Sequence, residues 1–419
     1  MQNLIKIAAL LLILPLCCFG SSAANSTQKT IVYVIEESTS APNTLTIHVD
    51  LDRTEQYSKT QLILRGVSMG IAEQVKNMTC DDKSIKENKP GAWSIPNGCQ
   101  KLQWQVPLLE GGTELAGAQQ SMKSGDFMLF SEASSLARLQ NTNTSEILKI
   151  SIPNVKKIFP SANLRGEITL PSANSAPFFV VVNPTVVGSD SSGSINLTYF
   201  LDNSVAVSKL PSMSSHMKGL RWLHSIIPGD TKQKFSVAWL GISEKQGGLA
   251  GAAGNGILLA NYPLEGEFPF GKAMLLYVGL HEGFHQFAMN YPTQPTWISE
   301  SLASYYGIRA LEVSLPNDPA TSALKERFLA GANQFHNGLL TINQHVKEGD
   351  RSEYGAFYTK GIAFWIAVDK ELKQRQEDGL DNYLIYLLRS KYDDPIELQR
   401  ILKLSPETWV SLCHRFLES

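Results

Sequence analysis

The 419-residue sequence lacks any marked excess of charge of one sign. Its 37 basic and 39 acidic side chains give a net charge of −2, and it contains no dense run of lysine and arginine. This balance excludes a broadly basic protein that binds nucleic acid through phosphate contacts. Hydrophobic residues make up 43% of the chain, so the polar bias of a disordered protein is also missing. We therefore expect a folded protein of two or three domains with no nucleic-acid partner.

Long apolar runs are absent after the first twenty residues. A single lysine precedes the run Ile7–Phe19, which is too short to span a bilayer comfortably. Small residues follow, so residues 1–24 are expected to be a secretory signal peptide cleaved near Ala23 or Ala24. The mature protein would then be secreted or periplasmic, with no membrane span. An uncleaved anchor and a lipoprotein are the alternatives.

Cysteine is scarce. Five cysteines are present, and signal cleavage would leave Cys80, Cys99 and Cys413. In an oxidising compartment, Cys80 and Cys99 are expected to form a disulfide across a short stretch rich in proline and glycine. Cys413 falls in an amphipathic helical pattern and is expected to be a buried thiol. No cysteine spacing matches a zinc site built from cysteines.

Glycine motifs that bind phosphate are missing as well. The glycine-rich stretch Gly247–Gly256 matches neither GxxxxGK[ST] nor GxGxxG. It also does not lie between a strand and a helix, as a phosphate loop would. We expect a flexible loop that precedes the strand GILLANY.

The hydrophobic patterns predict an α+β protein. Runs such as Leu45–Leu51, QLILRGV and Phe127–Phe130 are short, alternating or rich in β-branched and aromatic residues, and turn residues bound them. Three helix starts place a capping residue before proline, at Asp318-Pro319, Asp394-Pro395 and Ser405-Pro406. The expected parts are a β-sandwich-like region, a mixed core and a helical C-terminal part, over residues 25–171, 172–345 and 346–419.

The strongest chemical signal is the pentapeptide HEGFH, from His281 to His285. It lies in a helical pattern over residues 272–291, which Pro292 ends. Residues four apart on a helix lie about 40° apart in projection, so both histidines can reach one zinc ion. A third ligand would leave one position for a water, whose pKa zinc lowers to about 7. Glu282 could take a proton from that water and pass it to a leaving amine.

The segment WISESLASYYG, which begins at Trp297, offers the third ligand. It is expected to start a new helix with Glu300 in its first turn. A short reversal between the two helices can bring Glu300 back to His281 and His285. The spacing therefore predicts a site for one Zn²⁺ ion.

The sequences HEGFHQF and WISESLASYY resemble the zinc-binding helices of the gluzincin metallopeptidases. They are most similar to the glycyl aminopeptidase-like family, and more distantly to the aminopeptidase N group. The resemblance implies a thermolysin-like peptidase domain. In it, His281, His285 and Glu300 would be the zinc ligands, and Glu282 would be the general base.

A third segment, EYGAFYTKGIAFW, is similar to the family's helix with a YxKG motif. The resemblance assigns Tyr358 a hydrogen bond to the oxyanion of the tetrahedral intermediate. Tyr354, one turn earlier, is a second candidate for the cleft, whereas Lys360 and Gly361 are expected to be structural. Ser304 could either bond a zinc ligand or serve helix packing. Six histidines have no partner at a recognisable spacing and are expected to be structural or exposed, namely His48, His216, His224, His336, His345 and His414.

Two departures from the family pattern bear on function. Ser301 replaces the glycine that usually follows the ligand glutamate. The stretch GLAGAAGNGILLANY lacks the glutamate with which aminopeptidase N-type enzymes hold a free amino terminus. The main prediction is a zinc metallopeptidase acting on a peptide or protein, with endo- or exopeptidase action and oligomeric state left open. The alternatives are a binding or scaffold protein of little activity, and a hydrolase of a non-peptide amide or ester.

Overall fold

A computed structural model describes most of the chain after the first 29 residues. The described ranges are 30–51, 60–111, 119–140, 144–173, 175–202, 207–227, 233–243, 249–375, 379–390 and 395–418. The expected signal peptide and Asp394 lie outside them. Within the described ranges, no helix is both long and apolar enough to cross a membrane.

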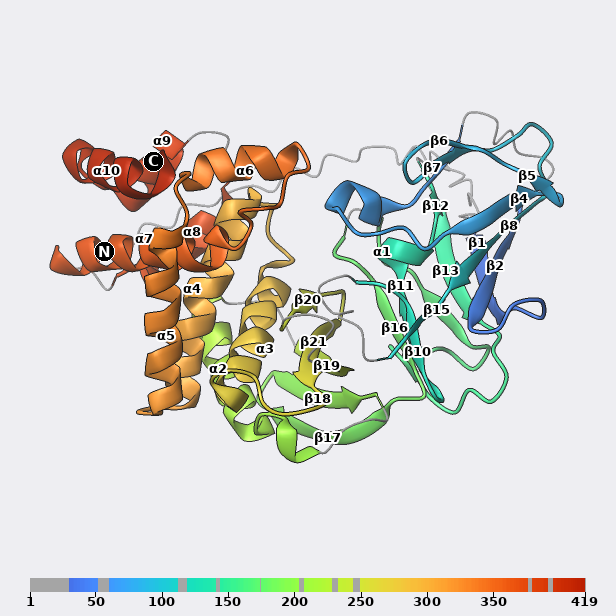
Figure 1. Cartoon of the computed structure of the whole chain (residues 1–419), viewed down its shortest axis with the longest axis horizontal. Coiled ribbons are helices and arrows are strands. Elements are labelled where there is room, and N and C mark those ends of the chain that lie inside the picture. Colours follow the sequence, from blue (N-terminus) through green and yellow to red (C-terminus); the bar gives the residue numbers. More distant parts are fainter. Residues whose placement is uncertain are drawn as a thin grey trace, which may run out of the picture.

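Three sheets surround one hydrophobic core in the N-terminal half, coloured blue to green in Figure 1. The largest has the order β15 (Glu167–Thr169), β13 (Ser145–Ile150), β1 (Thr30–Glu37), β2 (Thr44–Asp50), β8 (Lys101–Pro107), β4 (Lys76–Cys80) and β5 (Lys83–Ser84). The second has the order β14 (Ile158–Phe159), β16 (Phe179–Val182), β11 (Phe127–Ser131), β10 (Met122–Ser124) and β9 (Leu109–Glu110). The third has the order β12 (Arg138–Leu139), β3 (Gln61–Ile63), β7 (Ala92–Ser94) and β6 (Glu87–Lys89). We call residues 30–182 the β-rich half.

Strand alternation builds this core. In β8, Leu102, Trp104 and Val106 are buried while their neighbours are partly or fully exposed, as expected for a strand with one face toward a core. The run QLILRGV is a strand only over β3, and the 3₁₀ helix η2 (Arg65–Met69) follows it. The predicted disulfide between Cys80 and Cys99 is present, and Cys413 is a buried free thiol.

A fourth sheet lies beside the β-rich half. Its order is β17 (Thr185–Ser192), β18 (Ile195–Leu201), β19 (Gln233–Ile242), β21 (Ile257–Pro263) and β20 (Gly251–Ala253). The central pairs β18–β19 and β19–β21 are parallel, and both edge strands are antiparallel to their neighbours. The glycine-rich stretch expected to be a loop therefore contains an edge strand, because β20 pairs with β21.

The apolar stretch around Asn183 supplies two strands to two different sheets. β16 ends at Val182 and pairs with β11, whereas β17 begins at Thr185 and pairs with β18. Asn183 has a φ of 49°, a left-handed conformation that asparagine tolerates better than most residues. The chain thus leaves the β-rich half at this turn.

Most of the remaining chain is helical, and the helices α2 (Met213–Ile226) and α3 (Gly271–Ala288) lie against the fourth sheet (Figure 1). The other helices of this part are α4 (Thr296–Ser314), α5 (Pro319–Gly331), α6 (Leu339–Lys347), α7 (Ala356–Gln374), α8 (Asp381–Arg389), α9 (Pro395–Leu402) and α10 (Pro406–Leu412). Two predicted caps are confirmed, because Asp318 accepts from the Ala320 N–H and Ser405 accepts from the Thr408 N–H. We call residues 185–418 the helical half.

A separate hydrophobic cluster joins the two halves. Phe127, Leu129 and Phe179 of the β-rich half pack in it with Phe200 and Leu259 of the fourth sheet. The turn after β20 is held from the same side, because the Asn255 N–H donates to the Pro177 carbonyl at 2.7 Å. A Cβ at Gly254 would lie 2.2 Å from the Phe179 ring. The edge strand is therefore fixed by both halves.

Candidate metal centre

Helix α3 carries the HEGFH sequence through the interior of the molecule. It packs against α2, α4, α5, β20 and β21, and nearly all of its residues from Ala273 to Phe287 are buried. A Cβ at Gly279 would lie 2.7 Å from the His216 ring, and one at Gly283 would lie 2.7 Å from Leu220. The two glycines thus permit a close approach of α2. Burial on all sides compensates for the low helix propensity of glycine.

The two histidines and Glu300 converge on one point. The Nε2 atoms of His281 and His285 are 3.2 Å apart. Glu300 Oε2 lies 3.4 Å from the first and 3.6 Å from the second. Two ligands on a tetrahedral zinc, each about 2.1 Å from the metal, are about 3.4 Å apart. These three separations therefore fit the ligand set of one zinc ion.

Glu300 reaches this point because α4 lies closely against α3. Glu300 is the fifth residue of α4, slightly later than the first turn expected from the sequence. A Cβ at Gly307 would lie 3.4 Å from His281 Cβ and 3.2 Å from the Tyr277 ring. Glycine at this position therefore permits the close helix pair that aligns the three ligand atoms.

Two serines of α4 contact the outer nitrogens of the histidines. Ser304 Oγ lies 3.3 Å from His281 Nδ1 and donates to the Glu300 carbonyl at 2.7 Å. Since the single hydroxyl hydrogen is used in that bond, Ser304 can only accept from an Nδ1–H of His281. The lone pair of His281 then resides on Nε2, toward Glu300 and His285, as metal binding requires. Ser299, which the sequence did not single out, lies 3.5 Å from His285 Nδ1.

Glu282 lies beside this group, against the edge strand β20. The side chain is only 7% exposed, and a Cβ at Gly251 would lie 2.7 Å from its Oε1. Burial raises the pKa of Glu282, although the two histidines and a hydrogen bond from the Ala253 backbone favour its ionised form. A buried carboxyl with a raised pKa suits a group that accepts a proton and later returns it.

Helix α7 brings Tyr358 to the same place. Its ring centroid is 5.6 Å from that of His281. Burial, followed by the charge of Glu300, raises the pKa of Tyr358 well above its usual range, so the phenol remains a hydrogen-bond donor at neutral pH. Lys360, two residues later, donates to the Asn337 carbonyl at 2.8 Å, in agreement with its expected structural role.

Gly361 and Ser301 determine how α7 meets α4. A Cβ at Gly361 would lie 2.4 Å from Ser301 Cβ, so the glycine is needed for this approach. Ser301 Oγ accepts from Trp365 Nε1 at 2.7 Å. The serine that departs from the family pattern is thus accommodated beside Glu300 by a hydrogen bond.

Tyr277 is a further neighbour that the sequence analysis missed. Its ring centroid is 6.0 Å from that of His281, and burial raises the pKa of its phenol. The available signal was its spacing, since Tyr277 precedes His281 by four residues on the same helix face.

The other histidines do not join this group. His216 is fully buried and bonds the Tyr199 hydroxyl at 2.9 Å, and His48 lies 4.0 Å from Glu36 in the β-rich half. Among the described residues, one other cluster has metal-ligand geometry, formed by Cys80, Asp81 and Cys99. Its two cysteines are joined in the disulfide, which removes their thiolates as ligands.

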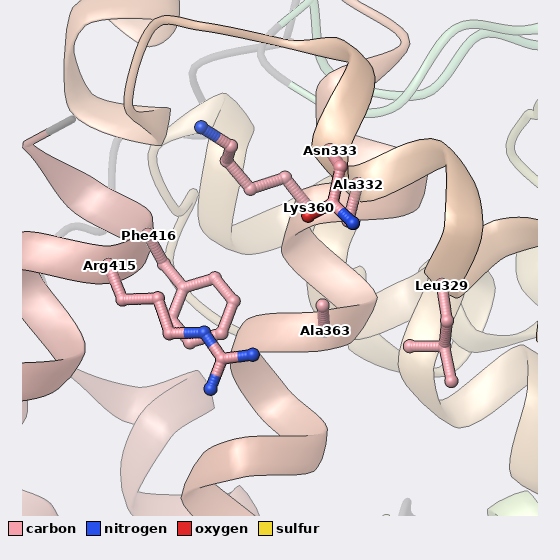
Figure 2. A pocket seen from close by; sticks show the side chains of 7 residues that line it. All are labelled: Leu329, Ala332, Asn333, Lys360, Ala363, Arg415 and Phe416. Carbon is pink, nitrogen blue, oxygen red and sulfur yellow. The ribbon is translucent and has the colours of Figure 1, made fainter.

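A cavity of about 290 Å³ lies next to the C-terminal end of the described chain. Lys360, Ala363 and Phe416 are among the residues that line it (Figure 2). Lys360 projects about 200° around α7 from Tyr358. This cavity therefore lies on the opposite face of the helix from the group of His281, His285 and Glu300.

No protein family and no curated protein matches the chain by sequence. Solved structures do resemble it. An aminopeptidase N family protein from Idiomarina loihiensis matches with a TM-score of 0.60 at 13% identity, over 93% of this chain and 74% of that one. An M1 zinc metallopeptidase from Deinococcus radiodurans matches with a TM-score of 0.55 at 12% identity, over 94% of each chain. A variant of that enzyme bound to a Tyr-Ser-Ala substrate matches with a TM-score of 0.56 at 12% identity, over 93% and 94%. At these identities the likeness shows the fold, which is α+β and similar to that of M1 metallopeptidases.

Proposed function

We propose that this protein is a zinc-dependent metallopeptidase of the gluzincin type, most similar to the glycyl aminopeptidase-like branch. One observation carries the proposal. Three potential metal-ligand atoms, from His281, His285 and Glu300, face one another at 3.2 to 3.6 Å, and Glu282 lies on the helix that carries both histidines. The thermolysin-like arrangement is supported by the position of this group between α3, α4 and the edge strand β20.

The proposed chemistry divides among five side chains and the metal. His281, His285 and Glu300 would hold Zn²⁺, which supplies Lewis-acid polarisation of a carbonyl and lowers the pKa of a bound water. Glu282 takes a proton from the attacking water and delivers it to the leaving amine nitrogen. Tyr358 donates its phenolic hydrogen bond to the carbonyl oxygen as negative charge develops there.

The edge strand β20 supports a peptide as the substrate. It ends the fourth sheet and lies against Glu282, as Gly251 shows. An extended peptide can add to such an edge through backbone hydrogen bonds, which select for a peptide main chain without selecting its side chains. A peptide bound in this way would pass directly over the general base.

Cleavage within a chain is favoured over removal of a free amino-terminal residue. The described part of the edge strand and its turn, residues 249–256, contains no carboxylate that could pair with an amino terminus. Phe179 fills the space that a side chain at position 254 would need. An ammonium group brought beside a zinc ion without a carboxylate partner would pay a desolvation cost.

The proposed location is outside the cytoplasm, either secreted or periplasmic. Residues 1–24 have the order of a signal peptide, and the Cys80–Cys99 disulfide is typical of an oxidising compartment. The test is the mass of the mature protein from fractionated cells. A protein that begins at Met1 and remains in the cytoplasm would contradict the proposal.

The function is tested with purified protein. We expect one zinc per chain and cleavage of a mixed peptide library read by mass spectrometry. Glu282→Gln should retain the zinc and lose activity by about a thousandfold. Pairing each peptide with its N-acetylated form measures the requirement for a free amino terminus. Stoichiometric zinc without cleavage of any peptide would reject the peptidase and leave a binding role or hydrolysis of a non-peptide amide or ester.

A further inference from the structure

Arg351 touches both halves of the molecule. It lies in the turn before α7, and its Nη1 donates to the Met69 carbonyl at 2.8 Å, although the two residues are 282 positions apart. On its other side, the guanidinium carbon lies 4.2 Å from the centre of the Tyr354 ring. One side chain thus links the end of η2 to the helix that carries Tyr358.

The β-rich half is shaped to receive this arginine. Gly70 ends η2 with a φ of 75°, a left-handed conformation that favours glycine. A Cβ at this position would lie 3.0 Å from Arg351 Nη1 and 3.6 Å from its Cδ. Glycine is therefore favoured both by the turn and by the space that the guanidinium occupies.

Tyr354 extends the connection from Arg351 to Glu300 and Tyr358. Its ring centroid lies 5.8 Å from that of Tyr358 and 5.1 Å from that of Phe357. Burial raises the pKa of Tyr354, and Glu300 raises it further, by its charge and by a hydrogen bond with the phenol. Tyr354 therefore contacts a proposed zinc ligand and the proposed oxyanion donor together.

We propose that Arg351 is a positioning residue through which the β-rich half holds Tyr354 against Glu300 and Tyr358. The proposal rests on the proposed function of Glu300 as a zinc ligand and Tyr358 as an oxyanion donor. A cation on the face of an aromatic ring restricts where that ring lies. A phenol bonded to a ligand carboxylate in turn fixes the orientation of that ligand, and partners of this kind affect metal affinity and activity.

The test measures zinc affinity by competition with a chelator, and then kcat and KM. Arg351→Met should weaken zinc binding about tenfold and lower kcat by a similar factor, with KM little changed. Arg351→Lys keeps a cation near the ring and should recover part of the loss. Gly70→Ala should produce the same kind of loss from the β-rich half, because its Cβ narrows the space for the guanidinium.

Two further variants separate positioning from a general loss of structure. Arg375→Met removes an arginine that also donates to a backbone carbonyl, that of Lys403 at 2.7 Å, at the other end of α7. It should leave zinc affinity and kcat unchanged. Tyr354→Phe keeps the ring and removes the phenol, so it should reproduce the loss, and Arg351→Met should add little to it.

The outcomes distinguish this inference from the proposed function. If the wild-type protein binds zinc but cleaves no peptide, the peptidase is rejected while the chelator measurement still tests Arg351. Wild-type zinc affinity and kcat in Arg351→Met would overturn the positioning proposal. So would an equal loss in Arg375→Met, or full additivity of Arg351→Met and Tyr354→Phe.

Discussion

Each half of the molecule buries a cluster of titratable side chains, and the two clusters differ in the groups that surround their carboxylates. In the β-rich half, fully buried Glu132 accepts from Arg138 Nη1 at 2.8 Å and from the Phe178 N–H at 3.1 Å. Arg138 Nε also donates to Glu146 at 3.0 Å. In the helical half, Nε2 of His281, Nε2 of His285 and a carboxylate oxygen of Glu300 face one another at 3.2 to 3.6 Å.

This difference separates a structural cluster from the proposed metal site. The carboxylates of the first cluster meet donors, so the protein itself satisfies them. When both imidazoles are neutral and carry their proton on Nδ1, the second cluster directs three lone pairs toward one point, and a cation at that point would satisfy all three at once. Burial of charge alone therefore does not indicate a metal site, whereas convergence of potential ligand atoms on one point does.

The largest effect expected in the β-rich half concerns stability alone. Glu132→Gln breaks a buried ion pair and should lower the free energy of unfolding by about 3–5 kcal/mol, measured by urea denaturation. Lys123→Gln is the matched control, because the exposed Lys123–Glu37 pair should contribute about 1 kcal/mol or less. Zinc affinity of the folded protein should not change. A weakened zinc site in Glu132→Gln would break the comparison.

The next effect belongs to the helical half and concerns chemistry alone. Tyr358→Phe removes the phenolic donor and should lower kcat about a hundredfold to a thousandfold. Because the ring remains, zinc affinity and the free energy of unfolding should stay close to wild type. Steady-state kinetics and urea denaturation on the same preparation measure both. An unfolding free energy reduced as much as in Glu132→Gln would show that Tyr358 serves packing.

His216 sharpens the comparison, because it is a buried titratable group of the helical half that has a structural role. Burial lowers the pKa of His216 to about 4, below its usual value near 6.5. The contribution of neutral His216 to the free energy of unfolding is therefore fully present above pH 6.5 and is lost as the pH falls toward 4. Between pH 7.5 and 5 the loss is about 2 kcal/mol.

Urea denaturation of metal-free protein at both pH values measures this contribution. His216→Gln has no imidazole to protonate, so its unfolding free energy should fall by that much less over the same interval. Identical pH dependence in the two proteins would mean that His216 is accessible to protons in the folded state.

The smallest effect tests the outer contact of a ligand. Ser304→Ala removes the group that accepts from His281 Nδ1 and should weaken zinc binding about tenfold. Ser314→Ala is the matched control, because Ser314 makes the same bond to the carbonyl four residues earlier, that of Ala310 at 2.7 Å. Chelator competition measures both variants. Equal zinc affinity in Ser304→Ala and wild type would show that Ser304 serves helix packing alone.

Local patterns predicted a large part of this structure. The strand β2 follows from alternation, and α3 follows from helical spacing ended by proline. The group of His281, His285 and Glu300 could be predicted because the two histidines lie four residues apart on one helix. Glu300 lies near the start of the next helix, which turns back toward them. Their roles as zinc ligands stay a prediction until the metal is measured.

Tertiary contacts account for what the sequence did not reveal. Gly251–Ala253 has low strand propensity and becomes a strand because β21 pairs with it and Glu282 packs beside it. The contact of Arg351 with Met69 joins residues 282 positions apart, and no periodicity encodes it. Ser299 lies next to the predicted ligand Glu300, yet serine is common in helical first turns and carried no distinct signal.

The packing of Phe179 on Gly254 has a consequence for how the two halves evolve. An aromatic ring of the β-rich half fills the place of a side chain on the turn of the edge strand, so a change at either position constrains the other. A chimera that combined halves from two distant relatives would misplace the strand beside Glu282, even with every proposed zinc ligand intact. We therefore expect substitutions at this contact in one half to be accompanied by compensating substitutions in the other.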